Sequence, residues 1–139
     1  MPAKDLYHNT VRHALEKDGW TITDDPLVIQ VDQKKSVYID LGAENLLAAK
    51  KAEQKIAIEI KSFIGKSFNA DFYMALGQFI TYYSILKEKE PDRILYLAVP
   101  KIIYKSQFDS KLVSLAAKTS GLKYIVYDIR EESILLWQN

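Results

Sequence analysis

The sequence predicts an α/β fold in which a mixed β-sheet is flanked by α-helices. Up to residue 64, apolar residues fall in short runs bounded by turn residues, which is typical of grouped strands. From residue 71 onward, segments with helical periodicity alternate with continuous apolar runs, as in chains that place helices against a sheet. The sequence shows no internal repeat, low-complexity tract or interdomain linker, so we expect one domain over residues 1–139.

The chain begins with a predicted helix over residues 4–18. Apolar residues recur at helical spacing from Tyr7 to Leu15, and Gly19 follows as a helix stop. Asp24-Asp25-Pro26 predicts a turn. Short strands, four of which we expect to form a meander, are predicted at Trp20 and Ile22, Leu27 to Val31, Val37 to Leu41, Leu46 to Ala49 and residues 56 to 64.

The segment from Leu46 to Lys51 allows a second interpretation. Leucine, alanine and lysine are good helix formers, so this segment is also compatible with a helix. We favour a strand because the gap before Ile56 has the length of a hairpin loop.

The second half of the chain starts with a long amphipathic helix from Asp71 to Lys89, and Pro91 marks its end. The apolar stripe expected to pack on the sheet comprises Phe72, Leu76, Phe79, Tyr83 and Leu86. The remaining predicted elements are a strand from Arg93 to Val99, a helix from Ser110 to Ser120 ended by Gly121, a strand from Leu122 to Ile129 and a last strand from Ser133 to Trp137 that pairs with it.

The composition indicates an ordinary soluble domain. Of 139 residues, 48% are hydrophobic and 27% charged, which is enough to bury a sizeable core. No apolar run approaches the ~20 residues of a membrane span, and the first residues lack a signal-peptide pattern, so we expect a cytoplasmic protein without a membrane partner. The absence of cysteine excludes disulfides, thiolate metal sites and cysteine nucleophiles.

The net charge of +1 does not indicate a domain that binds nucleic acid over its whole surface. Any contact with a polyanion must therefore be local. A solvated lysine-rich turn is the simpler interpretation, and a phosphate track is the alternative. The lysines concerned are Lys34, Lys35, Lys50, Lys51, Lys55, Lys61 and Lys66.

Three charged residues lie within or at the end of apolar strands. Glu59 and Lys61 share one face of the run at residues 56 to 64, and Asp40 closes the run that starts at Val37. Buried charges cost free energy unless they are paired, hydrogen-bonded or bound to metal. The three residues are therefore either a functional site or a structural ion pair.

These residues also carry a resemblance. Asp40, a hairpin, Glu59-Ile60-Lys61 and an amphipathic helix with Gln78 resemble the core of the PD-(D/E)XK nucleases, a superfamily with a restriction-endonuclease-like fold. Longer strings are Ala3-Lys4-Asp5-x-Tyr7-His8, Lys17-Asp18-Gly19-Trp20-Thr21-Ile22-Thr23-Asp24-Asp25-Pro26, Asp40-Leu41-Gly42-Ala43-Glu44, Glu59-Ile60-Lys61-Ser62-Phe63, Ala75-Leu76-Gly77-Gln78 and Leu95-Tyr96-Leu97-Ala98-Val99-Pro100. With them the chain resembles, almost end to end, the XisH family of fdxN element excision controlling factors of cyanobacteria.

The resemblance implies a role in programmed DNA excision and site-specific recombination. It implies Asp40, Glu59 and the carbonyl of Ile60 as ligands of Mg²⁺ or Mn²⁺, a kind of cation that prefers oxygen ligands. Lys61 would then hold the attacking water and offset transition-state charge. The implied partners are DNA, a site-specific recombinase and a small XisI-type protein, and we expect a homodimer because two strands are cut.

Other candidate residues have simpler explanations. Gln78 shares a separate helix stripe with Asp71, Ala75 and Tyr82, so it can support the site or face solvent. His8 is a candidate base or phosphate contact, but a surface histidine is the simpler interpretation. His13 is five residues away on another helix face, which argues against a two-histidine metal site. Core packing is the better account of most tyrosines, including Tyr7, Tyr83, Tyr96 and Tyr124.

Three hypotheses follow. The chain is a Mg²⁺-dependent endonuclease or junction-cleaving factor that uses Asp40, Glu59, Lys61 and Gln78. Alternatively, it is a non-catalytic accessory protein that binds DNA or a recombinase on a nuclease-like scaffold. In the third hypothesis it only binds protein, through a sheet edge or helices that dock a XisI-type partner.

Overall fold

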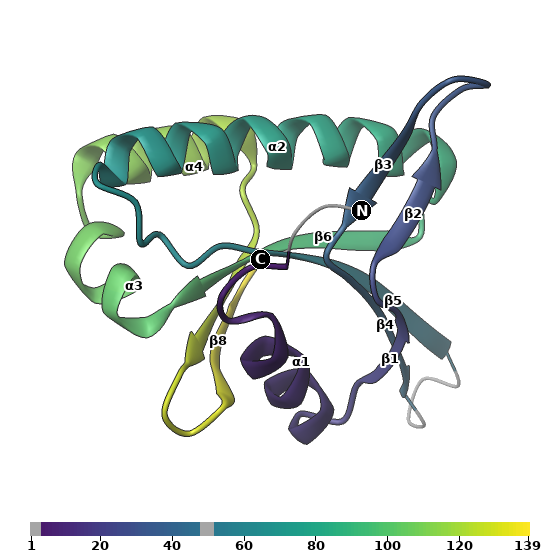
Figure 1. Ribbon diagram of the computed structural model, residues 1–139, viewed down its shortest axis with the longest axis horizontal. Coiled ribbons are helices and arrows are strands. Elements are labelled where there is room, and N and C mark those ends of the chain that lie inside the picture. Colours follow the sequence, from purple (N-terminus) through teal and green to yellow (C-terminus); the bar gives the residue numbers. More distant parts are fainter. Residues whose placement is uncertain (1–3, 48–51) are drawn as a thin grey trace.

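A computed structural model describes residues 4–47 and 52–139 of the chain. It contains a mixed β-sheet with helices on both faces, which confirms the predicted α/β fold (Figure 1). The elements in chain order are α1 (His8–Lys17), β1 (Thr21–Asp24), β2 (Leu27–Gln30), β3 (Ser36–Ile39), β4 (Leu41–Leu47), β5 (Ala52–Ile60), α2 (Phe68–Lys89), β6 (Arg93–Pro100), α3 (Lys101–Gln107), α4 (Lys111–Ser120), β7 (Tyr124–Asp128) and β8 (Ser133–Gln138).

The main sheet has six strands in the order β1-β4-β5-β6-β7-β8. The central pairs β5–β6 and β6–β7 are parallel, and the outer pairs β1–β4, β4–β5 and β7–β8 are antiparallel. Parallel neighbours need a crossover connection, and α2 provides it between β5 and β6. The sheet therefore joins an antiparallel amino-terminal part to a parallel centre.

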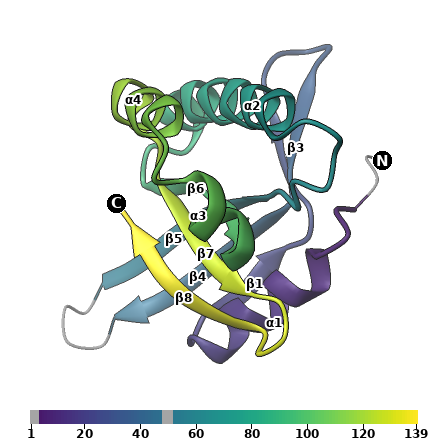
Figure 2. The ribbon, with the colours of Figure 1, turned by 90° about the vertical axis from the view of Figure 1, so that its left-hand side faces the viewer.

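Both faces of the sheet are covered (Figures 1 and 2). Helices α2 and α4 lie over one face, and α1 lies on the other. The sheet therefore separates two hydrophobic cores, and side chains along β5 alternate between them. Ile56, Ile58 and Ile60 belong to the core beneath α1, whereas Ala57 belongs to the core beneath α2. Glu59 has the same parity as Ala57, so its side chain starts on the α2 face.

Helix α2 is longer than predicted, since it begins at Phe68. Its N-cap is Ser67, whose hydroxyl accepts a hydrogen bond from the Ala70 N–H. Most of the expected apolar stripe is confirmed by the burial of Phe72, Phe79 and Leu86. The prediction for Tyr83 is wrong, since Tyr83 is exposed and Ala75 is buried. The core stripe is thus rotated toward the side that carries Gln78.

The predicted meander is wrong. Strands β2 and β3 pair only with each other in a two-stranded sheet, a hairpin that projects beside α2 (Figure 1). The run from Val37 to Leu41 is also not one strand, because the chain bends at Asp40 as it leaves this hairpin and enters the main sheet. Leu41 starts a new strand, β4, which ends at Leu47, and the rest of the segment predicted from Leu46 to Lys51 lies outside the described residues.

Other boundaries also differ from the prediction. The first helix starts at His8 and not at residue 4, and β5 starts at Ala52 and ends at Ile60. The sequence analysis missed α3, a short helix that follows directly after Pro100. No helix within the described ranges has the length and apolar character needed to cross a membrane.

Candidate functional site

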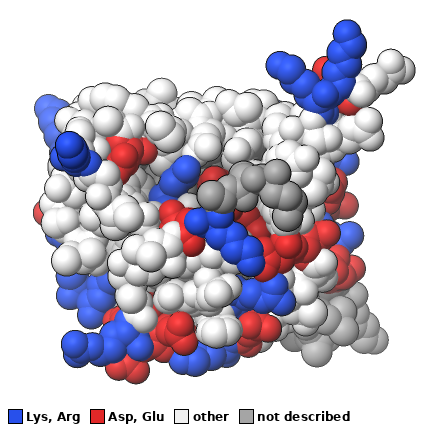
Figure 3. All heavy atoms as spheres, viewed as in Figure 1, with Lys and Arg blue, Asp and Glu red and all other residues white. Residues whose placement is uncertain are grey.

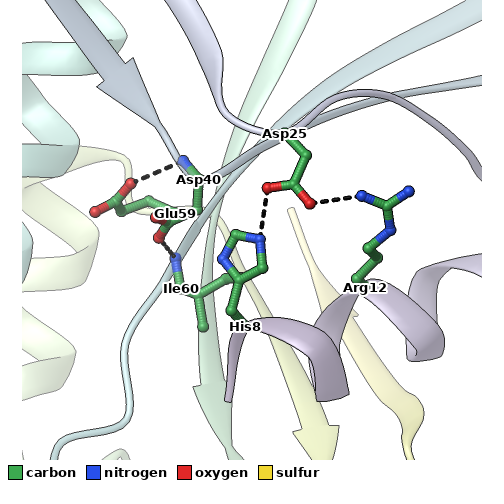
Figure 4. A network of polar contacts seen from close by, with 6 residues as sticks. All are labelled: His8, Arg12, Asp25, Asp40, Glu59 and Ile60. Carbon is green, nitrogen blue, oxygen red and sulfur yellow. Dashed lines mark hydrogen bonds and ion pairs between the residues drawn. The ribbon is translucent and has the colours of Figure 1, made fainter. Parts of the chain in front are cut away.

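The register of the sheet brings Asp40 and Glu59 together. In the antiparallel β4–β5 pair, Leu41 lies opposite Ile58, so the residue before Leu41 faces the residue after Ile58. The Asp40 N–H donates to Glu59 Oε1 at 3.3 Å, and the Ile60 N–H donates to Asp40 Oδ2 at 2.7 Å (Figure 4). The structure thus brings together the acids that are far apart in the sequence.

Lys61 follows the last residue of β5. Its Nζ lies 3.7 Å from Glu59 Oε2, and its backbone N–H donates to the Ala98 carbonyl of β6. The hydroxyl of Tyr127 donates to the Lys61 carbonyl, and the next N–H, of Ser62, donates to Asp5 Oδ2. The backbone that carries Lys61 is therefore held from β6, from β7 and from the amino-terminal segment.

A cavity of about 210 Å³ contains all four predicted site side chains. Its lining residues are Lys4, Asp5, Tyr38, Asp40, Glu59, Ile60, Lys61, Gln78 and Tyr82. Lys4, Asp5, Tyr38 and Tyr82 line the cavity but were not predicted as site residues, although the helical spacing of Gln78 and Tyr82 was a signal for Tyr82. Gln78 and Tyr82, which share one stripe of α2, both line this cavity.

Gln78 has an unusual environment. Its Oε1 atom is buried and has no hydrogen-bond partner among the described residues. A buried acceptor without a partner costs free energy, and such atoms commonly contact water or an ion. The oxygen is thus available to a group that binds in the cavity.

The two carboxyls have raised pKa values. Burial and the neighbouring Asp40 carboxylate raise the pKa of Glu59 to about 8, and Lys61 offsets only part of this effect. Burial also raises the pKa of Asp40, against the hydrogen bond from the Ile60 N–H. Burial, together with the charges of Glu59 and Asp40, raises the pKa of Tyr82. The cavity therefore lacks positive charge relative to its acids.

A second polar network lies beside the first (Figure 4). His8 Nε2 is 2.7 Å from Asp25 Oδ1, and Arg12 donates to the other oxygen of Asp25. Although burial opposes it, the hydrogen bonds from Arg12 and His8 lower the pKa of Asp25. The prediction of a surface His8 is wrong, because packing against the sheet buries it. His13 is exposed, so the two histidines do lie on different faces.

The tyrosine predictions are mixed. Tyr96 is buried, and the partly buried Tyr7 and Tyr124 pack against the two cores. Tyr83 lies on the outer side of α2 and belongs to neither core.

Comparisons with known proteins identify the family. The XisH protein family matches residues 1–135, whereas no curated protein matches the chain. The structure is similar to that of an XisH family protein from Nostoc punctiforme, with a TM-score of 0.88, 40% sequence identity and coverage of 97% of this chain and 100% of that chain. It is also similar to an fdxN element excision controlling factor protein from Anabaena variabilis, with a TM-score of 0.87, 42% identity and coverage of 98% and 100%. The chain belongs to the XisH family.

Proposed function

We propose that this chain takes part in programmed DNA excision as a cation-dependent endonuclease or junction-cleaving factor of the PD-(D/E)XK type. One observation carries the proposal: the buried carboxyl of Glu59, the half-buried carboxyl of Asp40 and the ammonium of Lys61 line the same cavity, although Asp40 is distant from the other two in the sequence. Paired acids with raised pKa values in a cleft are typical of functional sites.

The donor set of the cavity fits a hard divalent cation such as Mg²⁺ or Mn²⁺. Across residues 4–47 and 52–139, no three His, Asp or Glu side chains are grouped so as to hold a metal. Asp40 and Glu59 would therefore hold the ion together with the carbonyl of Ile60, and the unpartnered Oε1 of Gln78 adds a further oxygen nearby. A bound ion would supply Lewis-acid stabilisation of phosphate charge.

Lys61 has the position required of a group that acts on water and phosphate. Its ammonium lies beside Glu59, so it can hold a water molecule and offset negative charge that develops on the phosphate. The backbone contacts of Lys61 and Ser62 restrict where this ammonium can reach. Gln78 and Tyr82, from one side of α2, would orient the bound group.

The β2–β3 hairpin offers an approach for DNA. Tyr38 of β3 lines the cavity, and the exposed Lys34 and Lys35 lie at the tip of the same hairpin. Figure 3 shows basic side chains on this projecting arm and a mixture of acidic and basic side chains near the centre of the same face. We infer that the arm contacts the phosphate backbone while the cavity receives one phosphodiester.

Cation binding is tested by calorimetric titration with Mn²⁺. Titration of the wild type should show a heat of Mn²⁺ binding. Asp40→Ala should lose this heat, because one of the two carboxylate ligands is removed. Asp109→Ala removes an exposed acid outside the cavity and is the matched control. Absence of heat in the wild type would overturn the catalytic proposal.

Cleavage is tested on branched and linear DNA with Mg²⁺ in a gel assay. Lys61→Ala should reduce cleavage by at least about 10²-fold, the effect of removing a preorganised charge from a transition state. Lys105→Ala removes an exposed lysine of α3 outside the cavity and should retain cleavage. Equal cleavage by both variants would show that Lys61 has no role in the reaction.

A specific observation favours a non-catalytic alternative. Both acids already accept backbone N–H groups, as expected if they only stabilise the junction of β4 and β5. The chain would then be an accessory protein that binds DNA, a recombinase or a XisI-type partner on a nuclease-like scaffold. In that case co-purification with the partner survives Asp40→Ala, and no cation-dependent cleavage is found.

A further inference from the structure

The outer face of α2 carries a regular stripe that the fold does not use. Tyr73, Gly77, Ile80 and Ser84 are four, three and four residues apart, so they lie along one line of the helix. All four are exposed, and the two large ones, Tyr73 and Ile80, are 58% and 46% exposed. We name these four residues the outer stripe.

The outer stripe is complementary to itself when reversed. Its spacing is symmetric about the point between Gln78 and Phe79, and large residues alternate with small ones. In an antiparallel pair of α2 helices centred there, Tyr73 faces Ser84 and Ile80 faces Gly77. Each large side chain then meets a small residue, as in ridges packed into grooves.

Gly77 supports close approach of a second chain. Glycine in the middle of a helix is unfavourable compared with alanine. A Cβ at Gly77 would meet no atom within 4 Å, so the fold of this chain does not require glycine there. A helix from another molecule that packs closely against α2 gives a physical reason for it.

The charges at the ends of α2 favour the antiparallel direction. Asp71 lies in the first turn, and Lys87 and Lys89 lie in the last turn. Reversal about the same midpoint keeps the Lys87 residues of the two copies at opposite ends of the interface, and it also opposes the two helix dipoles. A parallel pair would instead align like charges.

The surface beside the stripe is also uncharged. A groove of about 900 Å³ between α2 and α4 is lined only by uncharged residues, among them Leu76, Tyr83, Leu112 and Leu115. In the view of Figure 3, the surface along the top of the molecule, over α2, carries few charged atoms. Such a groove does not suit a nucleic acid, which requires cationic contacts.

The size of this face suits a dimer. A helix of 22 residues is about 33 Å long, and α4 beside it widens the face, so two copies can be in contact along the whole length of α2. We infer that two copies of this chain pair through the outer stripe, antiparallel about a two-fold axis. The stripe lies away from Gln78 and Tyr82, so pairing leaves the cavity open.

The dimer is tested by light scattering and sedimentation of the full chain. The wild type should have twice the 16.0 kDa mass of one chain. Gly77→Leu should be a folded monomer, because the side chain has space in one copy but collides with Ile80 of the other. Ile102→Glu, on α3 and outside the stripe, should remain a dimer. A monomeric wild type would overturn the inference, even if that monomer binds a different protein. A dimeric Gly77→Leu variant would also overturn it.

The direction of pairing is tested by cross-linking, because the chain has no cysteine of its own. A double variant, Tyr73→Cys with Ser84→Cys, should form a covalent dimer on mild oxidation. Tyr73→Cys alone should not, since the two copies of this position would be about 16 Å apart along the axis, beyond disulfide reach. Efficient cross-linking by the single variant would overturn the antiparallel arrangement.

Discussion

Two neighbouring acid sites differ in how their negative charge is balanced (Figure 4). Asp25 receives both Arg12 and His8, one on each oxygen. Asp40 and Glu59 receive mainly backbone N–H groups, and the nearest ammonium, that of Lys61, is 3.7 Å from Glu59. Side chains of the chain thus bind both oxygens of Asp25, whereas Asp40 and Glu59 rely mainly on backbone donors.

The pKa directions express the same difference. The pKa of Asp25 is lowered despite its partial burial, while burial raises the pKa of Asp40 and that of Glu59. A carboxylate that accepts hydrogen bonds from an arginine and a histidine stabilises the fold, whereas two neighbouring acids with one lysine favour an additional cation or a proton. The comparison separates an acid that holds α1 in place from acids that can accept a further cation or proton.

The largest expected effect comes from neutralising one acid in each site. Asp25→Asn should lower the free energy of unfolding by about 2 to 3 kcal/mol, because it removes the charge that strengthens the hydrogen bonds from Arg12 and His8. Asp40→Asn should leave stability unchanged or raise it at pH 8, because an amide oxygen still accepts the Ile60 N–H. Urea unfolding of both variants measures this contrast. Equal losses would mean that both acids are structural, as in the scaffold alternative.

The pH dependence of stability gives a smaller effect. With a pKa of about 8 in the folded chain and 4.5 as its ordinary value, Glu59 keeps a proton that the unfolded chain releases. Stability should therefore fall as pH rises from about 4.5 to about 8, and the loss is complete above that window. Glu59→Gln should raise the free energy of unfolding by about 2 kcal/mol at pH 9 and by little at pH 5. Denaturant titrations at both pH values measure the difference, and a gain of equal size at both would contradict a raised pKa.

The smallest expected effect concerns Gln78. Gln78→Met removes a buried acceptor without a partner and keeps a similar side-chain volume, so stability without added cation should rise by about 1 kcal/mol. Thermal unfolding with and without Mn²⁺ measures this gain and the stabilisation by the cation, which should be weaker in the variant. If Gln78→Met lowers stability, its amide contributes to the fold and not to ligand binding.

The hydrophobic pattern of the sequence predicted most elements whose residues follow a single helical period or form one continuous apolar run. Helices α2 and α4 and strands β6, β7 and β8 follow from helical spacing or continuous apolar runs, and their boundaries differ by only a few residues. The short helix α3 was missed because its seven residues hold too little of a helical period. The prediction of a meander was wrong because the spacing of two strands in the sequence does not determine whether they pair. β3 pairs with β2 and ends before Asp40, and it does not continue into a pair with β4.

The sequence by itself determined the residue types of the site and the strand parity that places Glu59 on the face opposite Ile58 and Ile60. Only the tertiary structure decided that Asp40 faces Glu59, because this depends on the register of β4 and β5. It also decided the burial of His8 and the contact of Asp5 with Ser62, which depend on where α1 and the segment before it pack. Periodicity acts along one element, whereas register and packing join elements that are distant in the chain.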